Sequence, residues 1–407
     1  MGQCVKTEYL LLISSLSAIS ALGTDILLPG LNLISDEFHL PEPVDIQYAV
    51  SGFFLGMALG QLFVGPLSDR FGRKPVVQVG YAVFVFGCAL SIFAQSWIAI
   101  IAARFLQGLG AAAPRVVSMA IVRDEHDGTA MARILSITMA VFILVPIIAP
   151  ALGQGLIYLG GWRATHVALA VLSILVVFWF TVRQPETLQQ EDRISLGGWA
   201  ILSIVSQILR SRQAFGYTVA LGLITGAFVS YLSTAQAIFL GVFETGDLFA
   251  FYFALSAASL GAAALLNSWL VSRFDMVALT KFAMLAIVGV SLAFLAVIAG
   301  QGGVPPLWQF MGWLLAVFFC LGLIYGNLQA LALEPLGHIA GSASAFVGSI
   351  SLLISLPLSA VISAQINGTV YPLVTGFALL GIGSALVIWL VHFGQKIERA
   401  ENEGERQ

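Results

Sequence analysis

Long apolar segments separated by short polar connections make up most of this chain. A helix needs about 20 mostly apolar residues to cross a bilayer, and twelve segments of this chain are long and apolar enough. They are residues 9–31, 46–66, 76–95, 97–121, 132–158, 163–182, 214–241, 248–271, 279–300, 307–332, 341–365 and 370–393. Backbone polar groups have no water partner inside a bilayer, so each segment is expected to be an α-helix. The pattern therefore predicts an all-α membrane protein with twelve transmembrane helices.

Composition and charge agree with this prediction. Of the 407 residues, 59% are hydrophobic and 10% are charged, whereas soluble domains carry about 25% charged residues. Fifteen of the 18 Lys and Arg residues lie on the side of the N-terminus, Arg163 lies on the other side, and Arg104 and Arg115 lie deep within the fourth span. Because positive charge collects on the cytoplasmic side, both termini are predicted to be cytoplasmic.

The longest connection divides the chain into two halves of six spans. It includes the segment Ile194–Leu209, which is predicted to form a short amphipathic helix on the inner face. Ser68–Gly72 after span 2 is weakly repeated by Val271–Asp275 after span 8, as expected for a transporter built from parallel repeats. The predicted parts are an N-terminal half at 1–183, a cytoplasmic linker at 184–213, and a C-terminal half with a short tail at 214–407.

The connection between spans 2 and 3 holds the most specific motif, Gly65-Pro66-Leu67-Ser68-Asp69-Arg70-Phe71-Gly72-Arg73-Lys74-Pro75. It resembles the signature loop of the major facilitator superfamily. Glycine allows helices to approach closely and permits a tight turn, and Asp69 is expected to pair with Arg123 at the end of span 4. Such a pair can hold one gate state and break in the other; the alternative is a basic anchor without a gating role. The predicted gating residues are Gly65, Asp69, Arg70, Gly72, Arg73, Arg123 and Asp124.

Span 1 carries a single acidic residue away from its ends, Asp25, in the run Thr24–Pro29. An ionisable side chain in the hydrocarbon region is costly and therefore a functional candidate. Asp25 lies about 9 Å from the outer end of the span at 1.5 Å per residue, so water can reach it. We predict that it binds and releases a proton; the alternative is a static packing pair or a residue at the external edge.

Span 4 presents a polar or small face at the helical period, formed by Arg104, Gln107, Gly108, Ala111, Arg115 and Ser118. This face is expected to line a cavity or the bundle interior, with Arg104 at nearly the depth of Asp25. Arg104, Gln107 and Arg115 are therefore predicted to take part with Asp25 in coupling proton and substrate. Arg115 either binds an anionic substrate group or satisfies a buried carbonyl group.

Span 5 contains Pro146 and Pro150, followed by Gly153. Prolines in a helix remove backbone donors and bend it, and the glycine allows tight packing. The run 145–155 resembles the antiporter motif of drug/proton exporters, although Ala149 and Gln154 stand where that motif prefers glycine. The alternative is a kinked packing helix.

The C-terminal half has no acid clearly within a span, which suggests that proton chemistry belongs to the N-terminal half. Its polar span residues could line the substrate path: Tyr231, Thr234, Gln236, Tyr325 and Asn327. The histidines and cysteines have neither metal-ligand nor catalytic spacing, and the chain lacks a Walker loop. The expectation is a protein that is not an enzyme, with no cofactor and no bound metal.

Taken together, the chain resembles the Bcr/CflA branch of drug-resistance transporters in the major facilitator superfamily. The resemblance covers nearly the whole chain and rests on Thr24–Pro29, the loop at 65–75, Arg104–Gly108, Arg123-Asp124, the run 145–155, Gly161-Trp162-Arg163, Gly216–Thr218 and Tyr231–Ser233. It implies a multi-pass protein of the bacterial inner membrane that exports small molecules by antiport with protons. The best-known exporters of this kind have a second acid in span 1, where this chain has Ser17 or its neighbours.

Three functions compete at this point. The first is proton-coupled efflux of small molecules, whose partners are the substrate, protons and the lipid bilayer, with no nucleic acid and a monomeric protein. The second is export or import of a single metabolite, such as a siderophore or an amino-acid derivative. The third is a membrane sensor or enzyme that transports nothing, which the missing catalytic arrangement and signalling domain argue against.

Overall fold

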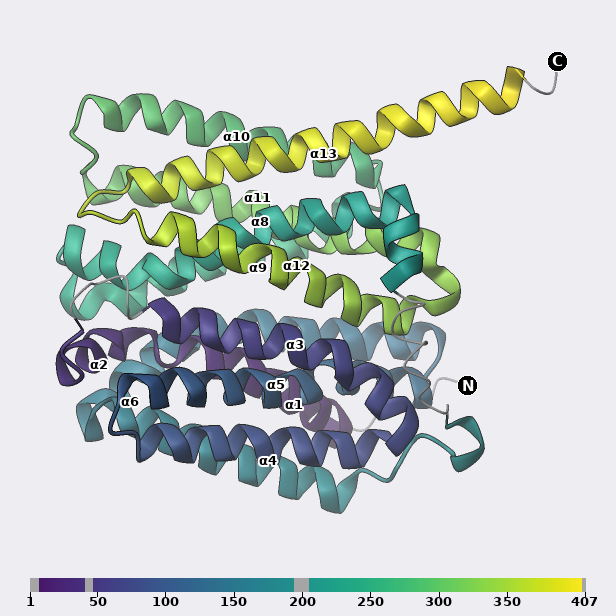
Figure 1. The fold of residues 1–407 in the computed structure, drawn as a ribbon, viewed down its shortest axis with the longest axis horizontal. Coiled ribbons are helices and arrows are strands. Elements are labelled where there is room, and N and C mark those ends of the chain that lie inside the picture. The colour runs from purple at the N-terminus through teal and green to yellow at the C-terminus, as the bar shows by residue number, and fades with distance from the viewer. Residues whose placement is uncertain (1–6, 41–46, 194–204, 405–407) are drawn as a thin grey trace. The chain divides into compact units, whose positions relative to one another are not determined.

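The structure is a computed structural model that describes residues 7–40, 47–193 and 205–404, and every regular element within these ranges is helical (Figure 1). The prediction of an all-α protein is therefore confirmed. The long helices are α1 Thr7–Asp25, α3 Gln47–Phe71, α4 Arg73–Ile92, α5 Trp97–Glu125, α6 Gly128–Arg183, α8 Arg212–Gln236, α9 Phe249–Leu270, α10 Met276–Ala299, α11 Leu307–Leu333, α12 Ala340–Ser363 and α13 Tyr371–Gly404. The predicted helix at 194–209 lies largely outside the described residues.

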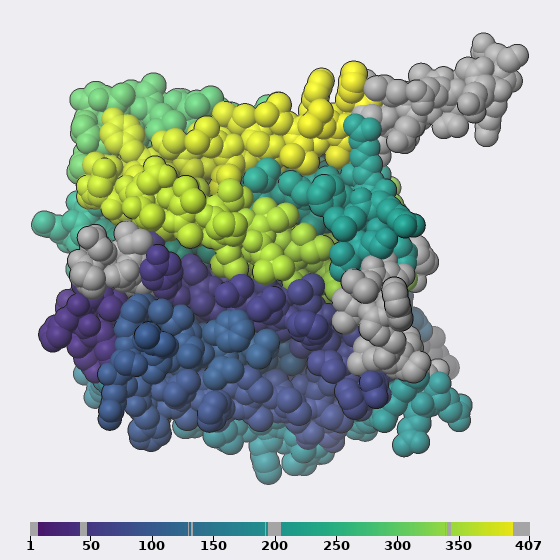
Figure 2. All heavy atoms as spheres, viewed as in Figure 1, coloured from purple at the N-terminus to yellow at the C-terminus, as the bar shows by residue number. Residues whose placement is uncertain are grey.

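Two compact units emerge from the packing, and they are described separately. The first comprises Met1–Ile201 and Leu232–Gly261, and the second comprises Leu202–Tyr231 and Ala262–Gln407. In the first unit, α5 packs against α3 and α4, and α1 packs against α6. In the second, α10 packs against α11 and α13, while α12 and α13 lie side by side on the face seen in Figure 2. The predicted division into two six-helix halves stays a prediction.

Eleven helical stretches among the described residues are long and apolar enough to cross a membrane. One of them, Arg133–Arg183, has 51 residues, about 76 Å of helix at 1.5 Å per residue, against a hydrocarbon thickness of about 30 Å. Its helix α6 turns back at Gly160 and Gly161, where φ of Gly161 is +68°. The left-handed conformation favours glycine. This stretch therefore holds two spans, which agrees with the twelve predicted.

The first span is not one continuous helix. Helix α1 ends at Asp25, and the chain continues through a 3₁₀ turn, Leu28–Gly30, into the short helix α2, Leu31–Glu37. Pro29 stands in this turn, where its missing N–H group and fixed φ oppose a regular α-helix. The helix therefore ends next to the acidic residue that the sequence singles out.

Glycine residues set the distance between α3 and α5. A Cβ atom placed on Gly108 of α5 would overlap the carbonyl oxygen of Phe53, and one on Gly56 of α3 would overlap that of Phe105. Helices in membranes associate through such close backbone contact because lipid provides no hydrophobic driving force between them. The contact fixes the α5 face that carries Arg104 against α3.

The substitution Gly108→Ala is expected to destabilise the protein by about 1–3 kcal/mol, because a methyl group in a packed contact forces the backbones apart. Thermal unfolding in detergent measures this effect. The control is Gly289→Ala in α10, where a Cβ atom would meet open space; it should leave the melting temperature unchanged or slightly raised. Equal melting temperatures for the two variants would contradict this packing account.

Candidate functional site

Asp25 lies buried at the break in the first span, with 4% of its surface exposed. Helix α6 approaches the same break so closely that a Cβ atom on Gly153 would overlap the carbonyl oxygen of Ile26. The side chain of Gln236 donates a hydrogen bond of 3.1 Å to the carbonyl oxygen of Pro29. The structure thus places the predicted acid next to Gly153, the glycine of the span 5 motif. Pro146 and Pro150 of that motif lie on the preceding turns of α6.

Arg104 is the largest fully buried side chain among the described residues, with 1% of its surface exposed. Its Nε donates to the carbonyl oxygen of Ala49 at 3.2 Å, and its Nη1 donates to that of Gly23 at 2.9 Å and to Oε1 of Gln107 at 2.8 Å. The guanidinium group also lies over the ring of Phe53, 4.5 Å from its centroid. Neutral groups from α1, α3 and α5 therefore hold this charge in place.

Asp25 and Arg104 are neighbours without forming a salt bridge. Arg104 binds the carbonyl group two residues before Asp25, and among the described residues no ion pair within 4 Å includes Asp25. Burial favours a neutral carboxyl group, while a nearby positive charge favours the carboxylate. Because Arg104 is held by neutral acceptors, it keeps its position whether Asp25 is protonated or charged.

The polar face of α5 lies in the interior of the first unit, and part of it contacts α1. Ser20 donates to the carbonyl oxygen of Ala111 at 2.8 Å, and the hydroxyl groups of Ser17 and Ser118 are 3.0 Å apart. Ser17 occupies the place where the resemblance leads one to expect a second acid, and here it serves as a link between α1 and α5. Gln107 continues the network by donating to the hydroxyl group of Ser91 at 3.1 Å.

The signature loop turns at Gly72, whose φ is +105°, and carries a cluster of charges. Arg73 pairs with Asp69 and, through Nε at 2.9 Å, with Asp124. Arg123 instead donates to the carbonyl oxygen of Met119 at 3.3 Å. In place of the expected pair between Asp69 and Arg123, the bridge from the loop to the end of α5 therefore runs through Arg73 to Asp124.

The remaining loop residues have simpler surroundings. Ser68 donates to the carbonyl oxygen of Gly65 at 2.8 Å, at a position where a Cβ atom on Gly65 would meet nothing within 4 Å. Arg70 is exposed and lies over the ring of Phe71. Neither contact ties the loop to another helix, so the connection rests on Arg73.

Glu186 in the linker is a residue of this site that the sequence pattern does not reveal. Its carboxylate accepts hydrogen bonds from the backbone N–H groups of Arg73 at 2.8 Å and Lys74 at 3.0 Å, at the start of α4. A carboxylate at a helix N-terminus satisfies free N–H groups and interacts favourably with the helix dipole. Thr187 adds a bond of 3.0 Å to Asp124. The linker thus binds both the start of α4 and the end of α5.

The residues of the later spans that are predicted to line a substrate cavity are buried or half-buried. Asn327 exchanges two hydrogen bonds, of 2.8 and 3.1 Å, with Asn267. Tyr231 is buried against Phe318, with ring centroids 4.7 Å apart. Tyr325 is half-buried. Gln236 and Thr234 belong to the first unit and are 3% and 0% exposed, so these two are held in packing contacts.

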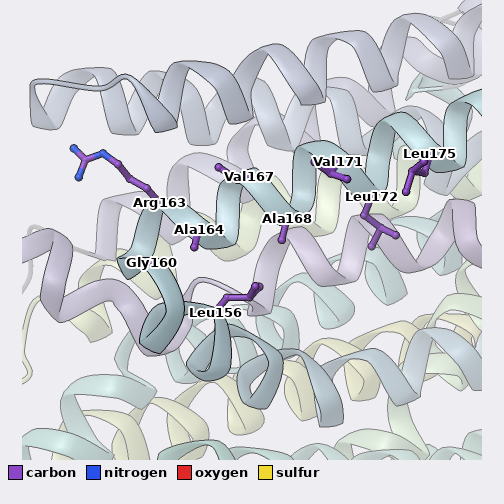
Figure 3. A pocket seen from close by; sticks show the side chains of 9 residues that line it. All are labelled: Leu156, Gly160, Arg163, Ala164, Val167, Ala168, Val171, Leu172 and Leu175. Carbon is purple, nitrogen blue, oxygen red and sulfur yellow. The ribbon is translucent and has the colours of Figure 1, made fainter.

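A groove of about 600 Å³ runs along α6, and Asp25 is not among the residues that line it (Figure 3). Its walls are almost wholly apolar, formed by Leu156, Gly160, Arg163, Ala164, Val167, Ala168, Val171, Leu172 and Leu175. Arg163 points away from it, and its guanidinium group binds the carboxylate of Glu37 at 2.6 and 2.8 Å. An apolar surface of this kind suits lipid chains rather than a polar substrate.

Metal-binding clusters of three or more His, Cys, Asp or Glu side chains are missing from the described residues.

Twelve spans with a buried acid and buried arginine define a multi-pass membrane transporter. Residues 13–356 match the model of the Major Facilitator Superfamily, and the chain belongs to that superfamily. It is 27% identical over 386 residues to a bicyclomycin resistance protein homolog of Haemophilus influenzae, covering 93% of this chain and 94% of the relative. It is 28% identical to the multidrug resistance protein MdtL of Shewanella oneidensis, covering 84% and 85%.

A solved structure of the xylose transporter XylE from E. coli has the same fold, with a TM-score of 0.73 and 13% identity over 94% of this chain and 96% of that one. The resemblance to Bcr/CflA-type drug-resistance transporters is thus confirmed, as are the multi-pass location in the inner membrane and the prediction that the protein is not an enzyme. The sidedness of the termini and the monomeric state stay predictions.

Removing the linker carboxylate is expected to loosen the start of α4. Glu186→Ala should cost about 0.5–2 kcal/mol, as for the loss of a helix N-cap, while Glu186→Gln keeps a neutral acceptor and should cost less. Melting temperatures in detergent measure the difference. Glu191→Ala, an exposed glutamate of the same linker, is the matched control. If Glu186→Ala and the control have the same melting temperature, the cap does not contribute to stability.

Proposed function

We propose that this chain exports small molecules across the bacterial inner membrane by antiport with protons, using alternating access. The observation that carries the proposal is Asp25, a buried carboxyl group at a break in a transmembrane helix beside a fixed guanidinium group. Such a group is costly in a membrane protein unless it serves transport. The drug-resistance names of two relatives support export rather than uptake.

In the proposed cycle, Asp25 takes up a proton when the protein is open to the outside. The protein then opens to the cytoplasm, where the incoming substrate displaces that proton. Arg104 stays in place throughout because its partners, the carbonyl groups of Gly23 and Ala49, do not titrate. The fixed positive charge lowers the free energy of the carboxylate once the proton has left.

The cytoplasmic charge cluster is the proposed gate. Asp69, Arg73 and Asp124 join the end of α3, the start of α4 and the end of α5. Ion pairs of this kind stabilise one arrangement of two packed elements and are exchanged in the other. Glu186 extends the cluster into the linker, so that a movement of the loop also displaces the linker.

The substitution Asp25→Asn is expected to reduce gradient-driven export by about 10-fold or more, because an amide cannot carry the proton that couples the two fluxes. Purified protein in liposomes with an imposed pH gradient measures export of bicyclomycin, the compound in one relative's name, and of ethidium. Exchange of the same compounds without a gradient should persist, because it needs no net proton transfer.

Asp36→Asn is the matched control, since Asp36 is an exposed acid later in the same span. It should export like the wild-type protein. Full gradient-driven export by Asp25→Asn would reject Asp25 as the proton site. A wild-type protein that exchanges these compounds but ignores the pH gradient would reject proton coupling altogether.

A further inference from the structure

Two arginines of α5 share one helix face but have opposite surroundings. Arg104 and Arg115 are 11 positions apart, about three turns at 3.6 residues per turn. Arg104 is buried and donates to three oxygen atoms. Arg115 is exposed, and the hydrogen-bond partner of its side chain among the described residues is the sulfur atom of Met57, 3.5 Å from Nη1.

The exposed surface of Arg115 lies within the bundle of the first unit. Arg115 stands ten residues before the end of α5 at Glu125, about 15 Å from that end. Met57 of α3 lies on one side of its guanidinium group, and the ring of Phe142 of α6 lies on another, with its centroid 5.1 Å away. Ser118, on the next turn of α5, meets Ser17 of α1. The guanidinium group of Arg115 therefore lies between α3 and α6, and its side chain is exposed.

The guanidinium group at this depth lacks an anionic partner among the described residues, since no carboxylate lies within 4 Å of it. A guanidinium group offers five N–H donors, and a thioether is a weak acceptor. A charge in a membrane span is retained when a partner or a transport role offsets its cost. The unused donors form a planar fork that matches carboxylate, sulfonate and phosphate groups.

Two unpaired hydroxyl groups lie on the neighbouring helices α1 and α6. The hydroxyl groups of Ser14 on α1 and Thr138 on α6 are buried, and neither has a hydrogen-bond partner. Their residues are 3% and 1% exposed. Thr138 lies one turn before Phe142 on the same face of α6. It stands ten residues after the start of α6, and Arg115 stands ten residues before the end of α5. The surroundings of Arg115 thus combine the unused donors of its own guanidinium group with an aromatic ring and a thioether.

From this arrangement we propose that Arg115 binds the anionic group of a transported aromatic organic anion, with Phe142 and Met57 contacting its apolar body. The proposal rests on the transport function proposed above and names one substrate class for it. Arg104 is not assigned this role, because its Nε and Nη1 already donate to carbonyl and amide oxygens and its side chain is buried.

Three probes with one ring system and permanent head groups test the proposal: naphthalene-2-sulfonate, the neutral naphthalene-2-sulfonamide, and 2-naphthyltrimethylammonium. Binding to the purified full chain in detergent and gradient-driven flux in liposomes are measured for each probe. The wild-type protein should bind and transport the sulfonate, and Arg115→Gln should lower both by about 10-fold or more through the loss of charged hydrogen bonds. The sulfonamide should be affected much less.

Arg115→Lys keeps the charge but not the planar fork, so it should retain part of the sulfonate binding. It also serves as a second variant if Arg115→Gln does not fold. Arg133→Gln, which removes an exposed arginine of α6, should behave like the wild-type protein. Sulfonate binding that survives Arg115→Gln, or a wild-type protein that binds no sulfonate, overturns the proposal.

The two proposals fail in different ways. Gradient-driven flux of the cationic probe without sulfonate binding rejects the anion assignment and leaves proton-coupled export standing. Sulfonate binding that depends on Arg115, together with flux that ignores the pH gradient, supports the anion assignment and rejects proton coupling.

Discussion

The buried guanidinium group of Arg104 is the interaction on which the first unit depends. In a membrane protein a charge in the interior cannot turn to water, so its donors must find acceptors within the bundle. The carbonyl groups of Gly23 and Ala49 supply them from two other helices. One side chain thereby joins α1, α3 and α5, and the glycine contacts between α3 and α5 keep the helices close enough for it to reach both.

The same interaction explains the position of Asp25. The carbonyl group of Gly23 lies in the last turn of α1, which ends at Asp25, where backbone oxygen atoms lack partners within the helix and can accept from Arg104. Gly153 lets α6 pack directly on this end. The helix end, the arginine and the packing of α6 thus form a single arrangement around the acid.

The sequence predicts those features that depend on local pattern. Span lengths, the turn at Gly72 and the polar face of α5 follow from hydrophobic runs, glycine and helical period. The partners of Arg104 do not, because backbone carbonyl groups carry no sequence signal. Glu186 escapes notice for a related reason: it caps a helix whose first residue lies 113 positions earlier in the chain. Arg73 and Arg123 are equally basic in the sequence, and only the fold decides that Arg73 bridges Asp69 and Asp124.

The pair between Glu37 and Arg163 has a consequence for how the chain is made. In the predicted orientation, Arg163 is the one basic residue that must be carried to the outer side during synthesis, at a cost that a partner can offset. Glu37 leaves the ribosome earlier, with the first span, and is already outside when the turn at Gly160 and Gly161 emerges. Trp162 adds a third bond to the same carboxylate, of 2.7 Å. The first span thus provides a docking point for the hairpin of spans 5 and 6 that is synthesised before the hairpin itself.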